Sequence, residues 1–101
     1  MMNLTYKHDW LEDLATNPEL KTAFNKAVVR AYRLLVTRIV AATDERDLRR
    51  IAGYEFKEGK GKRKGTYTMR LNDQFRVRFT ITPGTPKNTI NIIDVGDFHD
   101  K

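Results

Sequence analysis

Residues 66–81 read TYTMRLNDQFRVRFTI, and this stretch decides the fold. Apolar side chains occupy every second position on both sides of Asn72-Asp73, a dipeptide typical of hairpin turns. The pattern predicts two antiparallel strands, 66–71 and 75–81, each with one apolar and one polar face. Arg70 and Arg76 flank the turn, and the register of the two strands decides whether their guanidinium groups meet on one surface.

The segments around this hairpin extend the sheet. Residues 54–57 alternate like a strand, and residues 58–65 form a loop in which glycines and cations are interspersed. A turn with two prolines at 83–86 leads into a last strand, 89–95. Residues 3–7 predict a short strand near the start of the chain.

The region between the first strand and the hairpin is helical in pattern. Residues 8–15 predict one or two helical turns, with Trp10 as a core anchor. Thr16-Asn17-Pro18-Glu19 has capping-box spacing and a proline suited to the first helical position, so a helix is expected from there to about Ala42. We interpret its wide apolar stripe as core, with a surface covered by a partner as the alternative; the stripe includes Leu20, Phe24, Ala27, Ala31, Leu34, Leu35, Ile39 and Ala42, widened by Val29, Val36 and Val40.

A further short helix follows, with Thr43-Asp44 as its expected cap and Gly53 as its expected end. A strand, then helices, then consecutive strands is an order typical of the α+β class. We therefore expect a mainly antiparallel, four- to five-stranded sheet packed against two or three N-terminal helices. At 101 residues the chain is expected to form one domain, residues 1–101.

The chain is basic, with 19 Lys and Arg against 13 Asp and Glu and a formal net charge of +6. Residues 46–78 carry 11 of these cations and 4 of the acids, which favours an anionic partner such as nucleic acid over a merely solvated loop. The absence of cysteine excludes disulfide scaffolds, thiolate metal sites and cysteine nucleophiles. No apolar run is long enough for a membrane span and residues 1–7 do not resemble a signal peptide, so we expect a cytoplasmic protein without a membrane partner.

The predicted strand ends gather residue types that RNA cleavage needs. Lys57 and Lys60 lie at or just after one strand, and Asp97, Phe98 and His99 follow the last one. Attack by the 2′-hydroxyl of RNA requires a proton acceptor, cations that stabilise a dianionic transition state and a proton donor, and an aromatic ring can stack on the target base. Because the nucleophile belongs to the substrate, we expect no metal and no cofactor, and no cluster of acids or histidines has metal-ligand spacing.

Two stretches carry a family resemblance: residues 63–79 read RKGTYTMRLNDQFRVRF, and residues 92–99 read IIDVGDFH. The first resembles the central motif of HigB-type plasmid-maintenance killer toxins, and the second resembles their terminal strand and its Asp-Tyr-His close. Residues 44–48 resemble the acidic segment before that motif. The resemblance implies a RelE/ParE-superfamily fold and a toxin of a type II toxin–antitoxin system, which cuts mRNA in the ribosomal A site as a metal-independent endonuclease.

The resemblance also implies roles for single residues. Arg76 matches the motif arginine expected at the scissile phosphate, and Arg70 matches a basic strand residue. Lys60 matches a loop lysine of the catalytic site, and Asp97 and His99 match the terminal acid and imidazole, with His99 as the expected proton-transfer group. The residues expected to bind RNA around them are Lys57 (where some relatives have a His), Lys62, Arg63, Lys64 and Phe98.

Phe98 departs from the family pattern, which has Tyr there; Phe can stack on a base but cannot donate a hydrogen bond or a proton. Without the resemblance, Arg76 is equally well interpreted as an ion-pair residue bound to Asp94 or Asp97, and Arg78 as ordinary surface.

Two other functions stay open: a ParE-like toxin that inhibits gyrase, and a non-catalytic basic module that binds RNA or the ribosome. Either toxin implies a HigA-like antitoxin that forms an oligomer with this chain. We expect an acidic or amphipathic antitoxin segment to cover the basic patch or the surface of helix 18–42.

Overall fold

The computed structural model describes residues 2–97. In chain order, the elements are β1 (Asn3–Tyr6), α1 (Asp9–Thr16), α2 (Lys26–Ala41), α3 (Glu45–Arg49), a 3-10 turn (Ala52–Tyr54), β2 (Lys57–Glu58), a second 3-10 turn (Gly61–Arg63), β3 (Thr66–Arg70), β4 (Arg76–Thr82) and β5 (Thr89–Gly96). The α+β class expected from the sequence is confirmed. No helix within the described part of the chain is long and apolar enough to cross a membrane.

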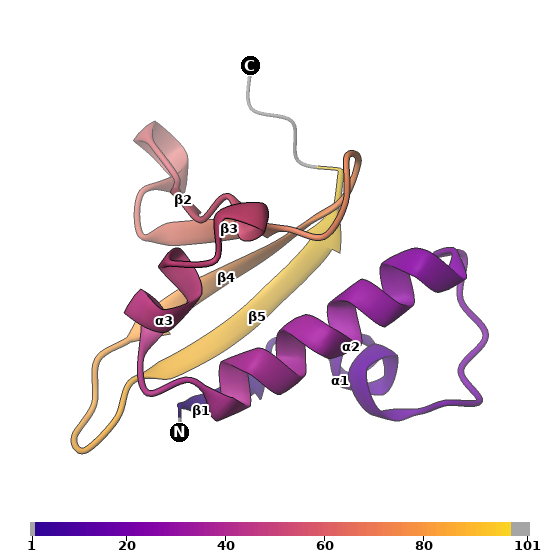
Figure 1. The fold of residues 1–101 in the computed structure, drawn as a ribbon, viewed down its shortest axis with the longest axis horizontal. Helices are drawn as coiled ribbons and strands as arrows, with labels where there is room; N and C mark the ends of the chain where they lie inside the picture. Colours follow the sequence, from indigo (N-terminus) through magenta and orange to yellow (C-terminus); the bar gives the residue numbers. More distant parts are fainter. Residues whose placement is uncertain (1, 98–101) are drawn as a thin grey trace.

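The five strands form one sheet in the order β1-β5-β4-β3-β2 (Figure 1). The pairs β2–β3, β3–β4 and β4–β5 are antiparallel, whereas β1 pairs parallel with β5. A parallel pair needs a long crossover connection, which the helices between β1 and the other strands supply. The mainly antiparallel sheet is therefore confirmed, with one parallel pair at its edge.

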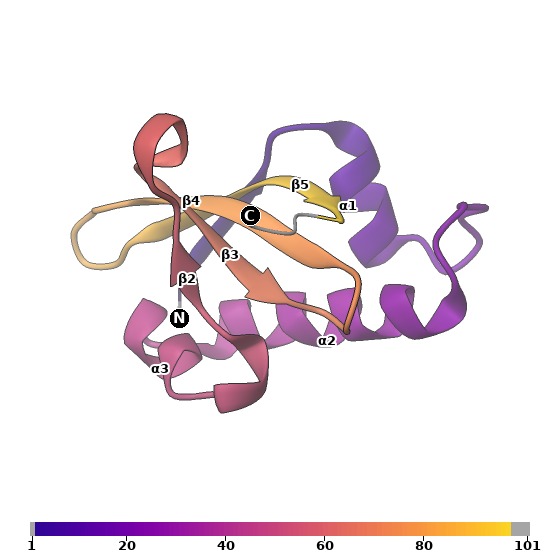
Figure 2. The ribbon, with the colours of Figure 1, turned by 90° about the horizontal axis from the view of Figure 1, so that it is seen from above.

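The helices α2 and α3 lie on the same side of the sheet (Figure 2). The fully buried strand residues are apolar members of the alternating pattern and form the core with α2: Met69, Val77, Phe79, Ile90 and Ile92. Full burial of a side chain of this size stabilises the fold by roughly 1.5–3 kcal/mol. The buried Tyr32 hydroxyl of α2 donates a hydrogen bond to the Leu11 carbonyl at 2.8 Å and so joins α2 to α1; burial raises the pKa of Tyr32.

The hairpin turn is formed as predicted. The Leu71 N–H donates to the Phe75 carbonyl at 2.9 Å. The Asn72 side-chain oxygen accepts hydrogen bonds from the backbone N–H groups of Gln74 and Phe75, at 2.9 and 2.7 Å. An asparagine at this position therefore replaces backbone partners that the turn lacks.

The predicted start of the long helix at residues 16–19 is wrong. α2 begins at Lys26, and the Asn25 side chain caps it by accepting a hydrogen bond from the Val28 N–H at 2.9 Å. The end is close to the prediction, because the last helical residue precedes Ala42.

A tertiary contact explains the late start. The Arg33 guanidinium of α2 donates hydrogen bonds to the carbonyls of Leu14 and Asn17, at 3.1 and 2.8 Å. These bonds hold the end of α1 against the middle of α2, so the chain needs a loop to turn back. The local capping pattern is therefore overridden, and residues 17–25 lie outside the regular helices.

The buried face of α2 also differs from the predicted stripe. Leu34 and Val40 belong to that stripe but are 48% and 39% exposed. The residues of α2 that are fully buried are Val28, Tyr32, Leu35 and Ile39. Apolar residues occur on more than one face of this helix, so periodicity alone could not select the face that meets the sheet.

Trp10 is not the predicted core anchor, because it is 41% exposed. Leu11 and Leu14 are the residues of α1 that are buried, as their helical spacing suggested. Trp10 instead stacks on Phe24 of the loop before α2, with ring centroids 6.5 Å apart.

Asp44 caps α3 as predicted, because its side chain accepts a hydrogen bond from the Arg46 N–H at 2.8 Å. Gly53 does not end this helix: α3 stops at Arg49, and Gly53 lies within the 3-10 turn Ala52–Tyr54. The short helix is correct in place but shorter than expected.

The strand expected over residues 54–57 is also wrong. Glu55 has left-handed backbone angles, φ 43° and ψ 55°, which interrupt an extended chain. The strand is reduced to Lys57–Glu58. A hydrogen bond from Arg76 to the Glu55 carbonyl holds this bend.

Candidate functional site

The β3–β4 register places Arg70 directly opposite Arg76. Both arginines therefore meet on one surface beside the hairpin turn. Like charges directly opposite one another destabilise a sheet unless an anion offsets their repulsion. The structure supplies such an anion in Glu55.

The Glu55 carboxylate lies among three cations. Oε2 is 3.4 Å from Arg70 Nε, and Oε1 is 4.0 Å from Arg76 Nη1 and 3.9 Å from Lys57 Nζ. These cations belong to β2, β3 and β4, so only the folded sheet brings them together. We call Glu55, Lys57, Arg70 and Arg76 the cation cluster.

Sequence reasoning missed Glu55. The alternating pattern of residues 54–57 puts Glu55 and Lys57 two positions apart, hence on one face, and this was the available signal. Its significance depends on the left-handed backbone of Glu55, the one non-glycine residue with positive φ in the described chain. Local pattern does not predict that conformation.

Arg76 is held on two sides. Nη2 donates a hydrogen bond to the Glu55 carbonyl at 2.6 Å, and Nε donates to Thr68 Oγ1 at 3.1 Å. Its side chain is only 12% exposed. The guanidinium is therefore pre-oriented, which reduces the entropy that binding an anion would cost.

The turn orients Arg70. Nε donates to the Asn72 carbonyl at 3.1 Å, and Nη2 contacts the Asp73 carboxylate. The Asn72-Asp73 dipeptide therefore has a second effect besides making the turn. Arg70 remains 33% exposed and open to a ligand.

Arg78 is not ordinary surface. It lies between Thr68 and Asp94 in the sheet register and is half-buried, with Nε and Nη2 out of contact with solvent. The sequence pattern placed it correctly on the polar face but could not show its burial.

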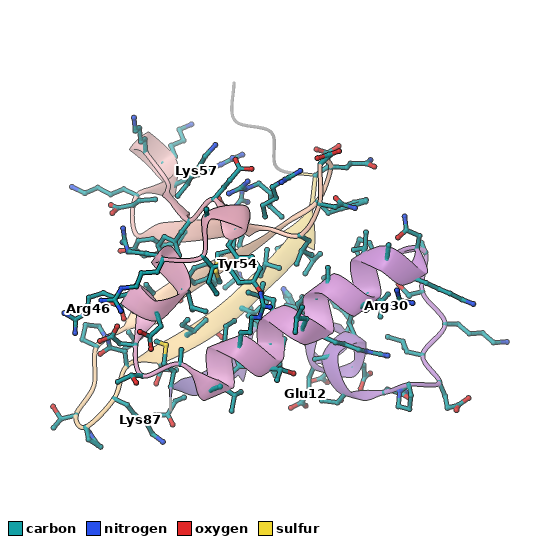
Figure 3. All side chains as sticks on the ribbon, in the orientation of Figure 1. Glu12, Arg30, Arg46, Tyr54, Lys57 and Lys87 are labelled. Atoms are coloured by element: carbon teal, nitrogen blue, oxygen red, sulfur yellow. The ribbon has the colours of Figure 1, made fainter. Side chains whose placement is uncertain are left out.

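The loop cations Lys60, Lys62, Arg63 and Lys64 are all exposed. A carbon at the Cβ position of Gly59 would lie 2.4 Å from the Arg63 carbonyl oxygen, so the loop packs too closely for a side chain there. The β2–β3 register puts Lys60 beyond the N-terminal end of β3, whereas Arg70 lies at the C-terminal end of that strand. The structure thus groups Lys60 with the loop cations and Lys57 with the two arginines. Figure 3 shows Lys57 in the upper part of the view and Lys87 in the lower part.

The end of β5 lies beside the cation cluster, because Gly96 pairs with Arg76. Asp97 follows immediately and is exposed. Phe98 and His99 lie outside the described residues, so their expected roles stay predictions. Within residues 2–97, no group of three or more His, Cys, Asp and Glu side chains could hold a metal ion.

A family model for RelE-like toxins of the type II toxin–antitoxin system HigB matches residues 4–95. The chain belongs to the HigB-like toxin family. Family membership confirms the class expected from the motif, a toxin of a type II toxin–antitoxin system. A search of curated protein sequences finds no match to this HigB-like toxin.

Solved structures share the fold of this HigB-like toxin at low sequence identity. YafQ from Escherichia coli BL21(DE3) is 14% identical, with a TM-score of 0.60 over 96% of this chain and 93% of YafQ. The YoeB/ParE toxin from Agrobacterium tumefaciens is 13% identical, with a TM-score of 0.59 over 97% of this chain and 100% of that one. A chain of the YoeB–YefM complex from Staphylococcus aureus is 19% identical, with a TM-score of 0.55 over 99% of both chains. These likenesses confirm the RelE/ParE-like fold.

Proposed function

We propose that this toxin cleaves mRNA in the ribosomal A site and that the cation cluster is the binding site of the scissile phosphate. The observation that carries the proposal is the opposed pair Arg70 and Arg76, with Lys57 beside them and the end of β5 adjacent. Three cations and one carboxylate leave a local charge of about +2, which favours a dianionic transition state over a monoanionic phosphodiester.

The chemistry is transesterification by the substrate's own 2′-hydroxyl. Arg76 and Arg70 bind non-bridging oxygens of the phosphate, and guanidinium groups suit this task because they donate in a planar fork. His99 protonates the leaving 5′-oxygen, Asp97 orients His99, and Phe98 stacks on a base of the codon. Lys60, Lys62, Arg63 and Lys64 bind the RNA backbone from the neighbouring loop, and this binding weakens with salt.

We propose that the reaction uses neither metal nor cofactor, because the nucleophile is internal and the cations supply the charge that a metal would supply. A phosphorothioate at the scissile position tests this. A metal-assisted reaction is slowed by the sulfur and rescued by Mn²⁺, whereas the proposal expects no rescue.

The main experiment measures cleavage of an mRNA positioned on programmed ribosomes. We expect cuts within the A-site codon by the wild type, and loss or strong slowing in Arg76→Ala and His99→Ala. Lys7→Ala is the matched control, since it removes an exposed cation just after β1, at the other edge of the sheet. Ribosome binding without cleavage would favour the binding module, and gyrase inhibition by the wild type would favour the ParE-like alternative.

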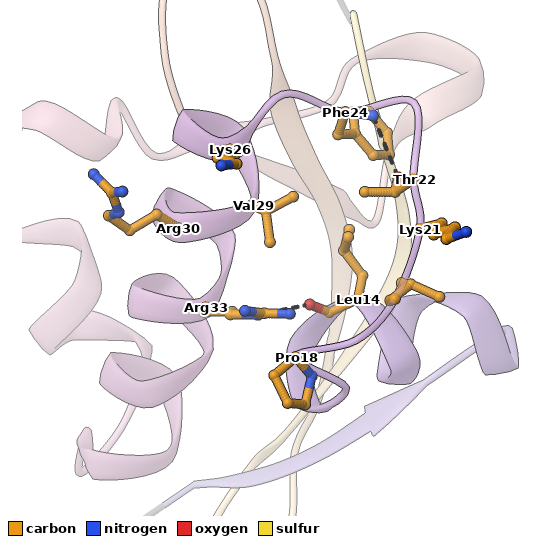
Figure 4. A pocket seen from close by; sticks show the side chains of 10 residues that line it. Leu14, Pro18, Lys21, Thr22, Phe24, Lys26, Val29, Arg30 and Arg33 are labelled. Atoms are coloured by element: carbon orange, nitrogen blue, oxygen red, sulfur yellow. Dashed lines mark hydrogen bonds between the residues drawn. The ribbon is translucent and has the colours of Figure 1, made fainter.

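We further propose that a HigA-like antitoxin holds this toxin in an inactive cytoplasmic complex. A groove of about 560 Å³, here called the α2 groove, lies between α2 and the loop before it (Figure 4). Leu20 and Phe24 contribute apolar surface, and the cations that line it are Lys21, Lys26, Arg30 and Arg33. An acidic amphipathic segment of the antitoxin fits both features.

The N-terminus of α2 favours this groove over the cation cluster as the antitoxin site. Its first turn has no acidic residue and begins with Lys26. Cations near a helix N-terminus are unfavourable because they add to the positive end of the helix dipole. An acidic partner relieves this, while the cation cluster has its own carboxylate.

A further inference from the structure

RNA cleavage by a 2′-hydroxyl needs two proton transfers, one from the nucleophile and one to the leaving oxygen. In the proposed function, His99 performs one of them. The described site holds a second group able to exchange a proton, the Glu55 carboxylate, whose side chain is 44% exposed.

The conformation of Glu55 is unusual and imposed. A non-glycine residue at φ 43° is disfavoured and persists when surrounding contacts enforce it, often at functional sites. The enforcing contact here is the 2.6 Å hydrogen bond from Arg76 Nη2 to the Glu55 carbonyl. Arg76 therefore holds the backbone that points the Glu55 carboxylate toward the cations.

The contacts of the carboxylate leave it available to a substrate. Its distances to Arg70, Arg76 and Lys57 are 3.4, 4.0 and 3.9 Å, all longer than an ordinary charged hydrogen bond. The cations thus attract and orient the carboxylate without using its oxygens as close acceptors. A phosphate bound by the same cations would lie next to the Glu55 carboxylate. The 2′-hydroxyl on the sugar beside that phosphate would then also lie close to this carboxylate.

We propose that Glu55 is the proton acceptor of the cleavage reaction. Its carboxylate oxygens face the same cations that would bind the phosphate, so one of them is placed to accept the proton of the 2′-hydroxyl. This inference rests on the proposed function and assigns the donor role to His99.

The step balances as follows. The 2′-O–H bond breaks and its proton passes to a Glu55 carboxylate oxygen, while a bond forms from the 2′-oxygen to phosphorus. The bond from phosphorus to the 5′-oxygen breaks, and that oxygen takes a proton from His99. The products are a 2′,3′-cyclic phosphate and a 5′-hydroxyl, and water later exchanges the protons between Glu55 and His99.

The test compares Glu55→Gln with Glu58→Gln on programmed ribosomes under single-turnover conditions. Glu58 is an exposed acid of β2 and serves as the matched control for loss of one negative charge. Loss of a general base slows cleavage by about 10²–10⁴-fold. We expect this drop in Glu55→Gln, with ribosome binding retained, and wild-type rates in Glu58→Gln.

A second variant separates a proton acceptor from a structural residue. Glycine tolerates the left-handed backbone, so Glu55→Gly keeps the bend while removing the carboxylate. We expect this variant to be slow and to regain activity when formate is added, whereas Glu58→Gly and Arg76→Ala gain nothing from formate. A structural role predicts no formate rescue, and that result would overturn the proposal.

The two proposals fail differently. If the wild type cleaves, Arg76→Ala does not, and Glu55→Gln cleaves normally, then Glu55 is not the acceptor while the endonuclease function stands. If the wild type does not cleave, both proposals fall.

Discussion

The Arg76 guanidinium donates a hydrogen bond to the backbone carbonyl of Glu55 at 2.6 Å and approaches the carboxylate of the same residue at 4.0 Å. One arginine of β4 thus positions both the backbone and the side chain of a residue 21 positions earlier. Arg76 therefore has a structural effect as well as its proposed role at the phosphate, and the two can be separated by substitution.

Substitution of Arg76 will lower both stability and activity. Arg76→Ala removes hydrogen bonds to Thr68 and Glu55, and a hydrogen bond made by a charged group is worth roughly 1.5–3 kcal/mol. Arg76→Lys keeps a cation but loses the planar fork, so we expect part of the stability to return and most of the cleavage to remain lost. Urea unfolding measures the first effect and the ribosome assay the second. Equal activity in Lys and Arg forms would contradict a forked phosphate contact.

The face of α2 that meets the core can be tested with two neighbouring leucines. Leu35 is fully buried and Leu34 is 48% exposed. We expect Leu35→Ala to destabilise the protein by about 2–5 kcal/mol and Leu34→Ala by less than about 1 kcal/mol. Urea unfolding of both variants measures the two losses of stability. A larger loss in Leu34→Ala than in Leu35→Ala would contradict the observed burial and support the apolar stripe predicted from the sequence.

The hairpin turn depends on the Asn72 side chain. Asn72→Ala removes the acceptor of two backbone N–H groups, and we expect a loss of about 1–2 kcal/mol. Gln74→Ala, at an exposed position of the same turn, is the control and should leave stability nearly unchanged. The backbone carbonyl of Asn72 that accepts from Arg70 remains in Asn72→Ala, so cleavage should fall only as far as the weakened turn displaces that carbonyl. Unaltered stability would show that water replaces the lost acceptor.

The α2 groove should report an antitoxin through fluorescence. Trp10 is the single tryptophan of the chain and stacks on Phe24, which lines the groove. We expect binding of the antitoxin to shift the emission of Trp10 to shorter wavelength, and Arg30→Glu to weaken binding at least tenfold, more at low salt than at high salt. Lys87→Glu, between β4 and β5, is the charge-matched control. Equal affinities would place the antitoxin elsewhere.

Acid should weaken the cap of α3. Hydrogen bonds from Arg46 hold the pKa of Asp44 below its usual value. The stability that this provides is complete above the ordinary pKa of an aspartate and is lost as pH falls through the lowered value. Asp44→Asn retains a capping oxygen but no charge, so the stability difference between wild type and variant should shrink in that acid range. Thermal unfolding as a function of pH measures it, and a constant difference would exclude the charge effect.

The sequence by itself determined the class of fold and the family. The strands 66–71 and 75–81, their turn at Asn72-Asp73 and the last strand were correctly predicted because alternation and turn chemistry are local properties of the chain. The end of α2 and the capping of α3 by Asp44 were also correctly predicted from the sequence. The same local pattern placed cations at the right strand positions, including Lys57, but not their mutual geometry.

Only the tertiary structure decided the start of α2, the exposure of Trp10 and the composition of the cation cluster. Arg33 holds the end of α1 against α2, so α2 begins later in the chain than predicted. The register of β3 on β4 sets Arg70 opposite Arg76, and Arg76 bends the chain at Glu55. Each of these outcomes depends on contacts between segments that are distant in sequence. The free energy of these contacts outweighs the small local preferences for helix and strand. It cannot be predicted from the residue pattern of a single segment.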